Sequence, residues 1–188
     1  MGFKLITGPA TEPVSLTEAK LHLKIETADT ADDSLIAIFI QAAREMAEQY
    51  TRRAFISQTW ELQMDCFEED DYSLITPCSS ITSVKYYDAS GVEQTVANTV
   101  YGLSTSSEPH ELFLKYGQLW PTVRGQEDDV KIRFVAGYTT LPASIKAAML
   151  LIIGHLYENR EDVVVGRQVA DLPKGSEYLL NPYRLFTF

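Results

Sequence analysis

Two short acidic runs carry side chains that could bind a cation. Residues 68–71 read Glu-Glu-Asp-Asp, and residues 127–129 read Glu-Asp-Asp. Carboxylate oxygens are ligands that Ca²⁺ prefers, but an EF-hand loop also needs alternating ligands, a central glycine and a closing glutamate. Neither run has that pattern, and each falls at a predicted β turn. We therefore interpret both runs as solvated acidic loops, and we expect no metal site and no bound cofactor.

Nucleophilic and metal-binding side chains are equally sparse. No two of the histidines His22, His110 and His155 have the i, i+4 spacing of a helical metal site. Cys66 alternates with apolar residues, which favours a buried, inert thiol on a strand, and neither Cys66 nor Cys78 has a metal ligand near it. The chain also lacks a Gly-x-Ser-x-Gly motif, a phosphate loop and a dinucleotide fingerprint. We expect a protein that is not an enzyme and has no catalytic residue.

The charge and hydropathy of the chain further narrow the classes of function that it could have. The 188 residues carry a formal net charge of −10, which opposes broad nucleic-acid binding because such binding needs clustered Lys and Arg. DNA that passes near such a surface would slide rather than bind. The longest apolar run, from Ala147 to Gly154, is too short for a bilayer span of about 20 residues. The length favours one domain, and the N-terminus lacks the apolar core of a signal peptide, which favours cytoplasmic synthesis.

Helical periodicity appears near both ends of the chain. Ser15 and Glu18 form a predicted capping box that starts a short helix ending by about Ile25. A second helix is predicted over 35–53, with its apolar side chains on one stripe. A third helix, over 142–159, is apolar nearly all round, so several neighbours must cover it. Because the chain has few other helices, we expect further copies of the same chain to supply that cover.

Between these helices the hydrophobic period changes to two. Alternation begins at Ser57 and continues through short strand candidates that are separated by turns, with a hairpin turn at 88–91. The predicted fold class is α+β: a helical bundle, built from N-terminal helices plus a long C-terminal helix, with an inserted antiparallel β unit. The predicted parts are an N-terminal arm and bundle helices (1–56), the inserted β unit (57–137), the long helix that completes the bundle (138–161) and a C-terminal tail for partner docking (162–188).

The chain also contains a series of short sequence motifs in a characteristic order. They are PVSLTEAKLHLK at 13–24, DDSLIA at 32–37, AAREMAEQYTRRA at 42–54, QTWE at 58–61, YYDASG at 86–91, FVAGY at 134–138, LYENRE at 156–161 and PYR at 182–184. Each motif alone is weak evidence for a family, whereas the ordered set covers nearly the whole chain. This set resembles the head–tail connector (neck adaptor) proteins of tailed bacteriophages and related gene-transfer particles.

The resemblance implies a structural virion protein of the neck, assembled in the cytoplasm of the host bacterium. Such proteins form a ring, usually of twelve copies, beneath the portal, where the ring extends the DNA channel and provides the platform for tail attachment. The implied partners are the same chain, the portal protein and a downstream neck or tail protein such as a stopper. DNA would pass through without sequence-specific binding, no membrane is implied, and the family has no catalytic motif to carry over.

Two sets of candidate residues accompany this resemblance. In relatives the C-terminal segment reaches toward the portal, and aromatic residues and Arg are typical interface anchors. The portal-docking candidates are Tyr183, Arg184, Leu185, Phe186 and Phe188. The subunit-interface candidates, on the two long predicted helices, are Ile38, Met46, Tyr50, Met149, Ile153, Tyr157 and Arg160. Packing of the C-terminal tail against its own domain remains an alternative.

Three other functions stay open at this point. A stopper or tail-terminator ring would bind the tail tube rather than the portal. A carbohydrate-active β module would need paired carboxylates with raised pKa values in a concave pocket. A small-ligand-binding domain would be a monomer with one well-formed apolar pocket.

Overall fold

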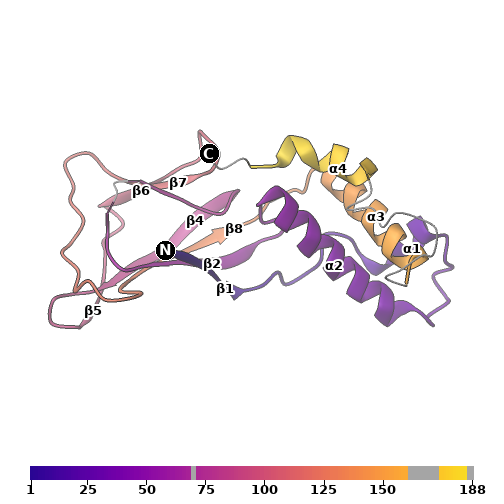
Figure 1. Ribbon diagram of the computed structural model, residues 1–188, viewed down its shortest axis with the longest axis horizontal. Helices are drawn as coiled ribbons and strands as arrows, with labels where there is room; N and C mark the ends of the chain where they lie inside the picture. The colour runs from indigo at the N-terminus through magenta and orange to yellow at the C-terminus, as the bar shows by residue number, and fades with distance from the viewer. Residues whose placement is uncertain (69–70, 161–173, 186–188) are drawn as a thin grey trace, which may run out of the picture. The chain divides into compact units, whose positions relative to one another are not determined.

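The computed structural model describes residues 1–68, 71–160 and 174–185 (Figure 1). The chain divides into two compact units. We call them the β unit, which is residues 1–10 and 56–139, and the helical unit, which is residues 11–55 together with the described residues from 140 onward. Within the described ranges, no helix combines the length and the apolar character that crossing a bilayer requires.

The larger sheet of the β unit has the strand order β1-β2-β8-β4-β5, and each neighbouring pair is antiparallel. Its strands are β1 (Gly2–Thr7), β2 (Gln58–Met64), β4 (Cys78–Tyr87), β5 (Glu93–Thr95) and β8 (Val130–Ala136). Strand β2 pairs with β8 without a break, from Gln58 opposite Ala136 to Met64 opposite Val130. Every second residue of β8 is buried, as expected for a strand with one face on a core.

A smaller sheet of the β unit has the order β3-β7-β6. Its strands are β3 (Asp71–Ser73), β6 (Tyr101–Ser104) and β7 (Glu111–Leu114). Tyr72 and Leu112 lie opposite each other and are buried. The Trp120 ring stacks on Phe67 with centroids 4.5 Å apart and an interplanar angle of 3°, and Tyr72 meets Trp120 edge-on. These contacts hold the loop that follows β7 against the rest of the unit.

The helical unit contains α1 (Leu16–Leu23), α2 (Asp33–Thr51), α3 (Ala143–Glu158) and α4 (Lys174–Leu180), followed by a 3-10 turn (Asn181–Tyr183). The predicted capping box is confirmed: Ser15 Oγ accepts from Glu18 N at 3.3 Å, and Glu18 Oε2 accepts from Ser15 N at 2.9 Å. Helix α2 ends where Arg52 takes a left-handed conformation (φ 58°) and donates its N–H to the Glu48 carbonyl.

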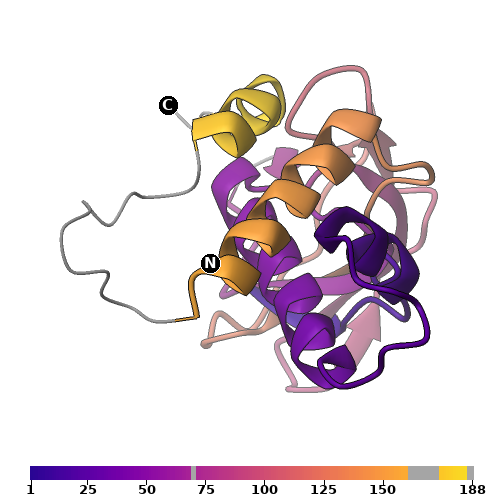
Figure 2. The same cartoon turned by 90° about the vertical axis from the view of Figure 1, so that its right-hand side faces the viewer.

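Helix α3 is as apolar as the sequence indicates, and the same chain covers most of it. Helices α1, α2 and α4 all pack against α3 (Figure 2). Its buried residues are Ile145, Ala148, Met149, Ile152 and Ile153. The interpretation that neighbouring copies must cover this helix is therefore wrong, because two short helices supply cover that periodicity alone does not reveal.

The predicted fold class, a helical bundle with a long C-terminal helix and an inserted β unit, is also wrong. The described residues form four helices and eight strands in two antiparallel sheets. Helix α3 ends at Glu158, and a separate helix begins at Lys174. Residues 2–7, predicted as part of an extended arm, pair with β2 as β1. Gly8 and Pro9 favour an extended arm, but residues 2–7 pair with β2 as an edge strand. The strands therefore form a compact unit of their own.

Candidate assembly surfaces

The acidic run at 127–129 is held by an internal ion pair. Asp129 is 1% exposed and accepts bonds from Arg124 Nη2 at 2.5 Å and from Gln126 N at 2.7 Å. The hydrogen bond from Arg124, followed by that from the Gln126 backbone, outweighs desolvation and lowers the pKa of Asp129. The expectation of a solvated loop is therefore wrong for Asp129, whose carboxylate closes this turn.

The candidate metal ligands are dispersed. In the run 68–71, residues 69 and 70 lie outside the described residues, and Asp71 begins β3. His22 and His155 are exposed on α1 and α3. Within the described ranges, no three His, Cys, Asp or Glu side chains gather in a way that would hold a metal ion.

The two thiols have the properties of structural residues. Cys66 lies beyond the end of β2 and is partly exposed, so its predicted position on a buried strand face is wrong. Its Sγ donates to Glu68 Oε1 at 3.4 Å, and this bond raises the pKa of the thiol. Burial raises the pKa of the Cys78 thiol to about 11, and His110 Nδ1 lies 3.0 Å from the Cys78 carbonyl oxygen. Since the thiolate is the nucleophile, raised pKa values disfavour reactivity at both positions.

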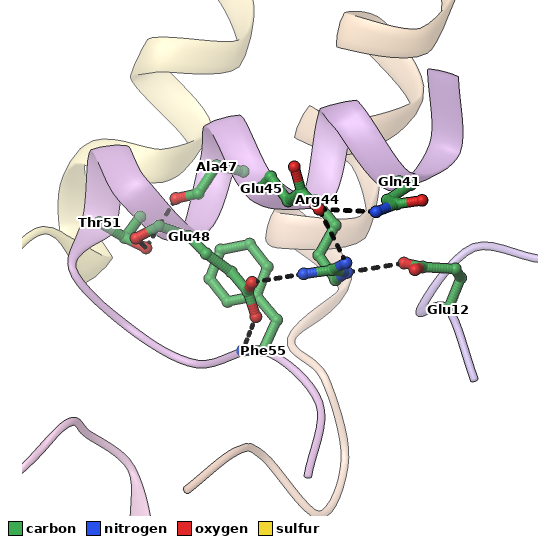
Figure 3. A network of polar contacts seen from close by, with 8 residues as sticks. All are labelled: Glu12, Gln41, Arg44, Glu45, Ala47, Glu48, Thr51 and Phe55. Carbon is green, nitrogen blue, oxygen red and sulfur yellow. Dashed lines mark hydrogen bonds and ion pairs between the residues drawn. The ribbon is translucent and has the colours of Figure 1, made fainter. Parts of the chain in front are cut away.

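An ionic cluster of the helical unit centres on Arg44 of α2 (Figure 3). Arg44 is 6% exposed, and it donates through Nε to Glu12 and through Nη1 to Glu48, each at 2.8 Å. A longer contact of 3.4 Å reaches Glu45. Burial lowers the pKa of Arg44, but the bonds to Glu12 and Glu48 outweigh it and raise the pKa overall. The Arg44 guanidinium is therefore charged at all physiological pH values.

This Arg44 cluster fixes both ends of the segment 11–55. Glu12 follows the start of that segment, and Phe55 closes it. Glu48 uses one carboxylate oxygen for Arg44 and the other, Oε1, to accept the Phe55 N–H at 2.7 Å. Arg44 thus ties the incoming chain to α2, and Glu48, which Arg44 holds, ties the outgoing chain.

The C-terminal segment folds back onto the end of α2 as far as residue 185. Leu185 N donates to the Thr51 carbonyl at 3.1 Å, and Arg53 Nε donates to the Tyr183 carbonyl at 2.5 Å. Tyr50 donates its hydroxyl to Asn181 at 2.6 Å. We call these contacts the C-terminal clamp; they agree with the alternative that the tail packs on its own domain.

The clamp uses part of the predicted portal-docking set. The Tyr183 hydroxyl lies 2.8 Å from Ser144 Oγ, and the Leu185 N–H is part of the clamp. Arg184 is exposed, with its guanidinium carbon 5.0 Å from the centroid of the Tyr50 ring. Phe186 and Phe188 lie outside the described residues.

Among the predicted subunit-interface residues, those on α2 form an exposed stripe. Ile38 is 63% exposed and Met46 is 38% exposed, and Ala42 lies between them at helical spacing. Tyr50 continues the stripe but is only partly exposed. We call Ile38, Ala42 and Met46 the α2 stripe; its two large side chains, Ile38 and Met46, are open to solvent in the described chain, and Ala42 between them is half-buried.

The candidates on α3 have other roles within the helical unit. Met149 and Ile153 are fully buried, so they belong to the core and cannot also meet a neighbouring copy. Asp32 accepts from the Tyr157 hydroxyl at 2.6 Å and from Arg160 Nη2 at 2.8 Å, and these bonds lower the pKa of Asp32. Tyr157 and Arg160 therefore link the end of α3 to the start of α2.

Sequence reasoning missed several exposed apolar residues of the β unit. Tyr116 and Leu119, in the loop after β7, are 105% and 85% exposed, and Phe3 and Leu5 on β1 are each 45% exposed. The alternation of Phe3 and Leu5 was a usable signal for a strand, whereas nothing in the local sequence distinguishes Tyr116 and Leu119 from core residues.

Comparison with known proteins adds a family to this geometry. The profile of the head completion protein family matches residues 13–184. A chain in the neck of an empty gene transfer agent particle, computed with C6 symmetry, has a TM-score of 0.81 and 25% sequence identity. A chain in the virion of the native gene transfer agent particle has a TM-score of 0.80 and 25% identity.

A third solved chain, in the neck of the native gene transfer agent particle computed with C12 symmetry, has a TM-score of 0.75 and 26% identity. Each of the three matches covers 100% of this chain and 97% of the other. No curated protein matches the sequence. The predicted resemblance is thereby confirmed: the chain belongs to the head completion protein family and is a structural protein of the virion neck.

Proposed function

We propose that this chain assembles into a closed ring of twelve copies beneath the portal, extends the DNA channel and provides the platform for tail attachment. The observation that carries the proposal is the similarity over the whole chain to a neck protein of a particle computed with C12 symmetry. A closed ring requires one head-to-tail interface repeated around an axis. The α2 stripe supports this proposal because it offers an apolar surface that a second copy would bury.

Within such a ring, Ile38 and Met46 would form the centre of the subunit contact. Both are large apolar side chains at helical spacing, and both are open to solvent in the single chain. Tyr50 would lie at one end of this contact, and Tyr157 and Arg160 would lie at its polar rim. The buried residues Met149 and Ile153 are not part of the proposed interface.

The C-terminal segment is the proposed portal-docking element. Its path up to Leu185 is fixed by the C-terminal clamp, so the exposed Arg184 has a defined position. Arg is well suited to a docking contact because its guanidinium both stacks on aromatic rings and pairs with carboxylates. Arg184, together with Phe186 and Phe188, would contact the portal, while the opposite side of the ring would receive the stopper.

DNA would pass through the ring without sequence-specific binding. The formal net charge of −10 repels a polyanion, and the counterion release that drives DNA binding requires clustered cations. Acidic side chains facing the bore would ease the passage of DNA. A bore lined with Lys and Arg would contradict this part of the proposal.

Imaging of particles made with and without this chain tests the function. Without it we expect DNA-filled heads that carry no tail, and supplying the chain in trans should restore tailed particles. Tailed, infective or transfer-competent particles in the absence of the chain would overturn the proposed role.

A binding assay distinguishes a portal adaptor from a stopper or tail terminator. Immobilised chain should retain purified portal protein, and replacement of Arg184 by Glu should weaken that retention. Retention of tail-tube protein, with no retention of portal, would instead favour a ring at the tail end.

A further inference from the structure

Among the described strands, β1 forms one unpaired edge of the larger sheet of the β unit, with Lys4 and an irregular register between Leu5 and Thr7 as its protection against unspecific pairing. All of its residues are exposed, and among the described strands it pairs only with β2. Phe3 and Leu5 are each 45% exposed, Ile6 is 37% exposed, and Lys4 is the one charged residue of the strand. Soluble proteins protect their edge strands with charges, bulges, prolines or short length. One lysine and one irregularity leave three apolar side chains open on a strand of six residues, which favours pairing with another chain.

The opposite edge of the same sheet, β5, is open as well. All of its residues are exposed, and among the described strands it pairs only with β4. Val92, directly before this strand, is 54% exposed. Since each neighbouring pair in the order β1-β2-β8-β4-β5 is antiparallel, β1 and β5 run in the same direction.

The two edges share one row of the sheet, at the start of β1 and the end of β5. Its register joins Gly2, Gln63, Lys131, Lys85 and Thr95 in one row. A second copy displaced sideways by the width of the sheet would thus bring Thr95 beside Gly2, and a further slide of two residues along the strands would bring Glu93–Thr95 beside Gly2–Lys4. Residues of one row point to the same face, and a slide of two keeps that face, so Thr95 would neighbour Gly2 without the slide and Lys4 with it.

The charges of the two edges are complementary. Strand β1 carries Lys4 and no carboxylate, whereas residues 88–95 carry Asp88 and Glu93 and no cation. Lys85 already donates to Glu93 at 2.7 Å, so backbone bonds and buried apolar area would supply most of the affinity. The charges would favour β1 against β5 over contact between two β1 edges, because that contact would bring two Lys4 side chains together.

We infer that β1 of one copy pairs in parallel with β5 of the next copy, so that the sheet continues from subunit to subunit. The inference rests on the proposed ring and names a contact through which it closes. Because the contact joins two different edges, it is head-to-tail and repeats around the ring, whereas pairing of identical edges would stop at a dimer.

Cysteine cross-linking in assembled particles tests this contact. The double variant Gly2→Cys/Thr95→Cys places one thiol on each edge in the same row. The variant Lys4→Cys/Thr95→Cys covers a slip of two residues, since Gly2 and Lys4 share a face. Mild oxidation should give a ladder of dimers, trimers and higher multiples on a denaturing gel, and reductant should collapse it. Mass spectrometry should find the disulfide that joins the two edge peptides.

Controls separate this contact from the ring itself. Each single-cysteine variant and the parent chain, with Cys66 and Cys78, should give no ladder. A series that ends at the dimer would overturn the head-to-tail pairing. An absence of cross-links from both double variants, in necks whose ring symmetry is intact, would overturn the β1–β5 contact while leaving the proposed function in place. A neck without a ring of this chain would instead refute the proposed function.

Discussion

At the scale of single residues, Arg44 is a position in the helical unit where we expect substitution to cause a large loss of stability. Its guanidinium is buried and bonded to Glu12 and Glu48. Replacement of Arg44 by Ala would leave these carboxylates without their cation, and breaking one partner of a buried ion pair costs about 3–5 kcal/mol. We expect a loss of that size in the free energy of unfolding, measured by urea denaturation.

Glu45 provides the matched control for Arg44. Its side chain is 57% exposed and reaches Arg44 only at 3.4 Å. Because exposed ion pairs contribute little, Glu45→Ala should change the free energy of unfolding by less than about 1 kcal/mol. Equal losses for both variants would show that the cluster does not depend on burial.

Glu18 gives the helical unit a dependence on acid. A hydrogen bond from Lys146, followed by bonds from the Ser15 backbone and hydroxyl, lowers the pKa of Glu18 from 4.5 to about 2. A lowered carboxyl pKa contributes stability that is present above the unfolded value and is lost as the pH falls through the folded value. Thermal unfolding should therefore show a loss between about pH 4.5 and pH 2. Glu18→Gln should reduce that slope, modestly because the side chain is 44% exposed; an unchanged slope would contradict the assignment.

Residue-level prediction worked where the cause is local. The capping box of Ser15 and Glu18 depends on a spacing of three residues and was readable from sequence. The bond between Arg44 and Glu12 joins residues 32 positions apart, so it follows from the path of the chain. Asp129 looked solvated because its run is acidic, and only the position of Arg124 explains its burial.

At the scale of elements, Gly137 permits a close backbone contact directly after β8. Its φ is +137°, and a Cβ there would lie 2.3 Å from the carbonyl carbon and oxygen of Ile56. Gly137→Ala should therefore cost more than about 3 kcal/mol, a loss typical of severe overpacking and backbone strain. Gly117 also has positive φ but has open space around it, so Gly117→Ala should cost only about 1–2 kcal/mol. Similar melting temperatures for the two variants would contradict the role of the close contact.

The α2 stripe makes an element-level prediction about assembly. Ile38→Glu should leave the stability of the single chain within about 0.5 kcal/mol, because the site is exposed. The same change should prevent ring formation, because a charge would be buried at the copy–copy contact. Ile38→Val keeps the apolar surface and should assemble. Native mass spectrometry of reconstituted necks measures the outcome, and full assembly of the Glu variant would remove the α2 stripe from the interface.

Element prediction from sequence succeeded for strong periodic patterns and missed the strands β1 and β6. The long helices α2 and α3 and the strands β2 and β8 each have a clear apolar period. Strand β1 was missed although Phe3 and Leu5 alternate, because Gly8 and Pro9 directly after it favour an extended arm, and β6 has only four residues, one of them a glycine. The cover of α3 could not be predicted, because α1 and α4 approach it through tertiary contacts. The fold class failed for the same reason: local patterns do not say which elements share a core.

At the scale of the whole molecule, the ordered set of short sequence motifs predicted the function better than the apolar character of α3 did. The apolar character of α3 indicated assembly only because this helix was expected to lack cover within its own chain, and α1, α2 and α4 supply that cover. The resemblance across the chain pointed to the neck of a virion, and the family match over residues 13–184 bears it out. Exposed apolar surface lies elsewhere, and the α2 stripe and β1 are the parts of it that we propose for assembly. These sites were hard to select from sequence because an exposed apolar residue resembles a core residue until its neighbours are known.

The most direct test of the proposed ring is a reconstruction of the neck, by electron cryomicroscopy without imposed symmetry, from particles that contain this chain. The account predicts a closed ring of twelve copies in contact with the portal, with Ile38 and Met46 buried between adjacent copies. Density for this chain that forms no ring, or a ring that touches only the tail and leaves Ile38 and Met46 in solvent, would contradict it.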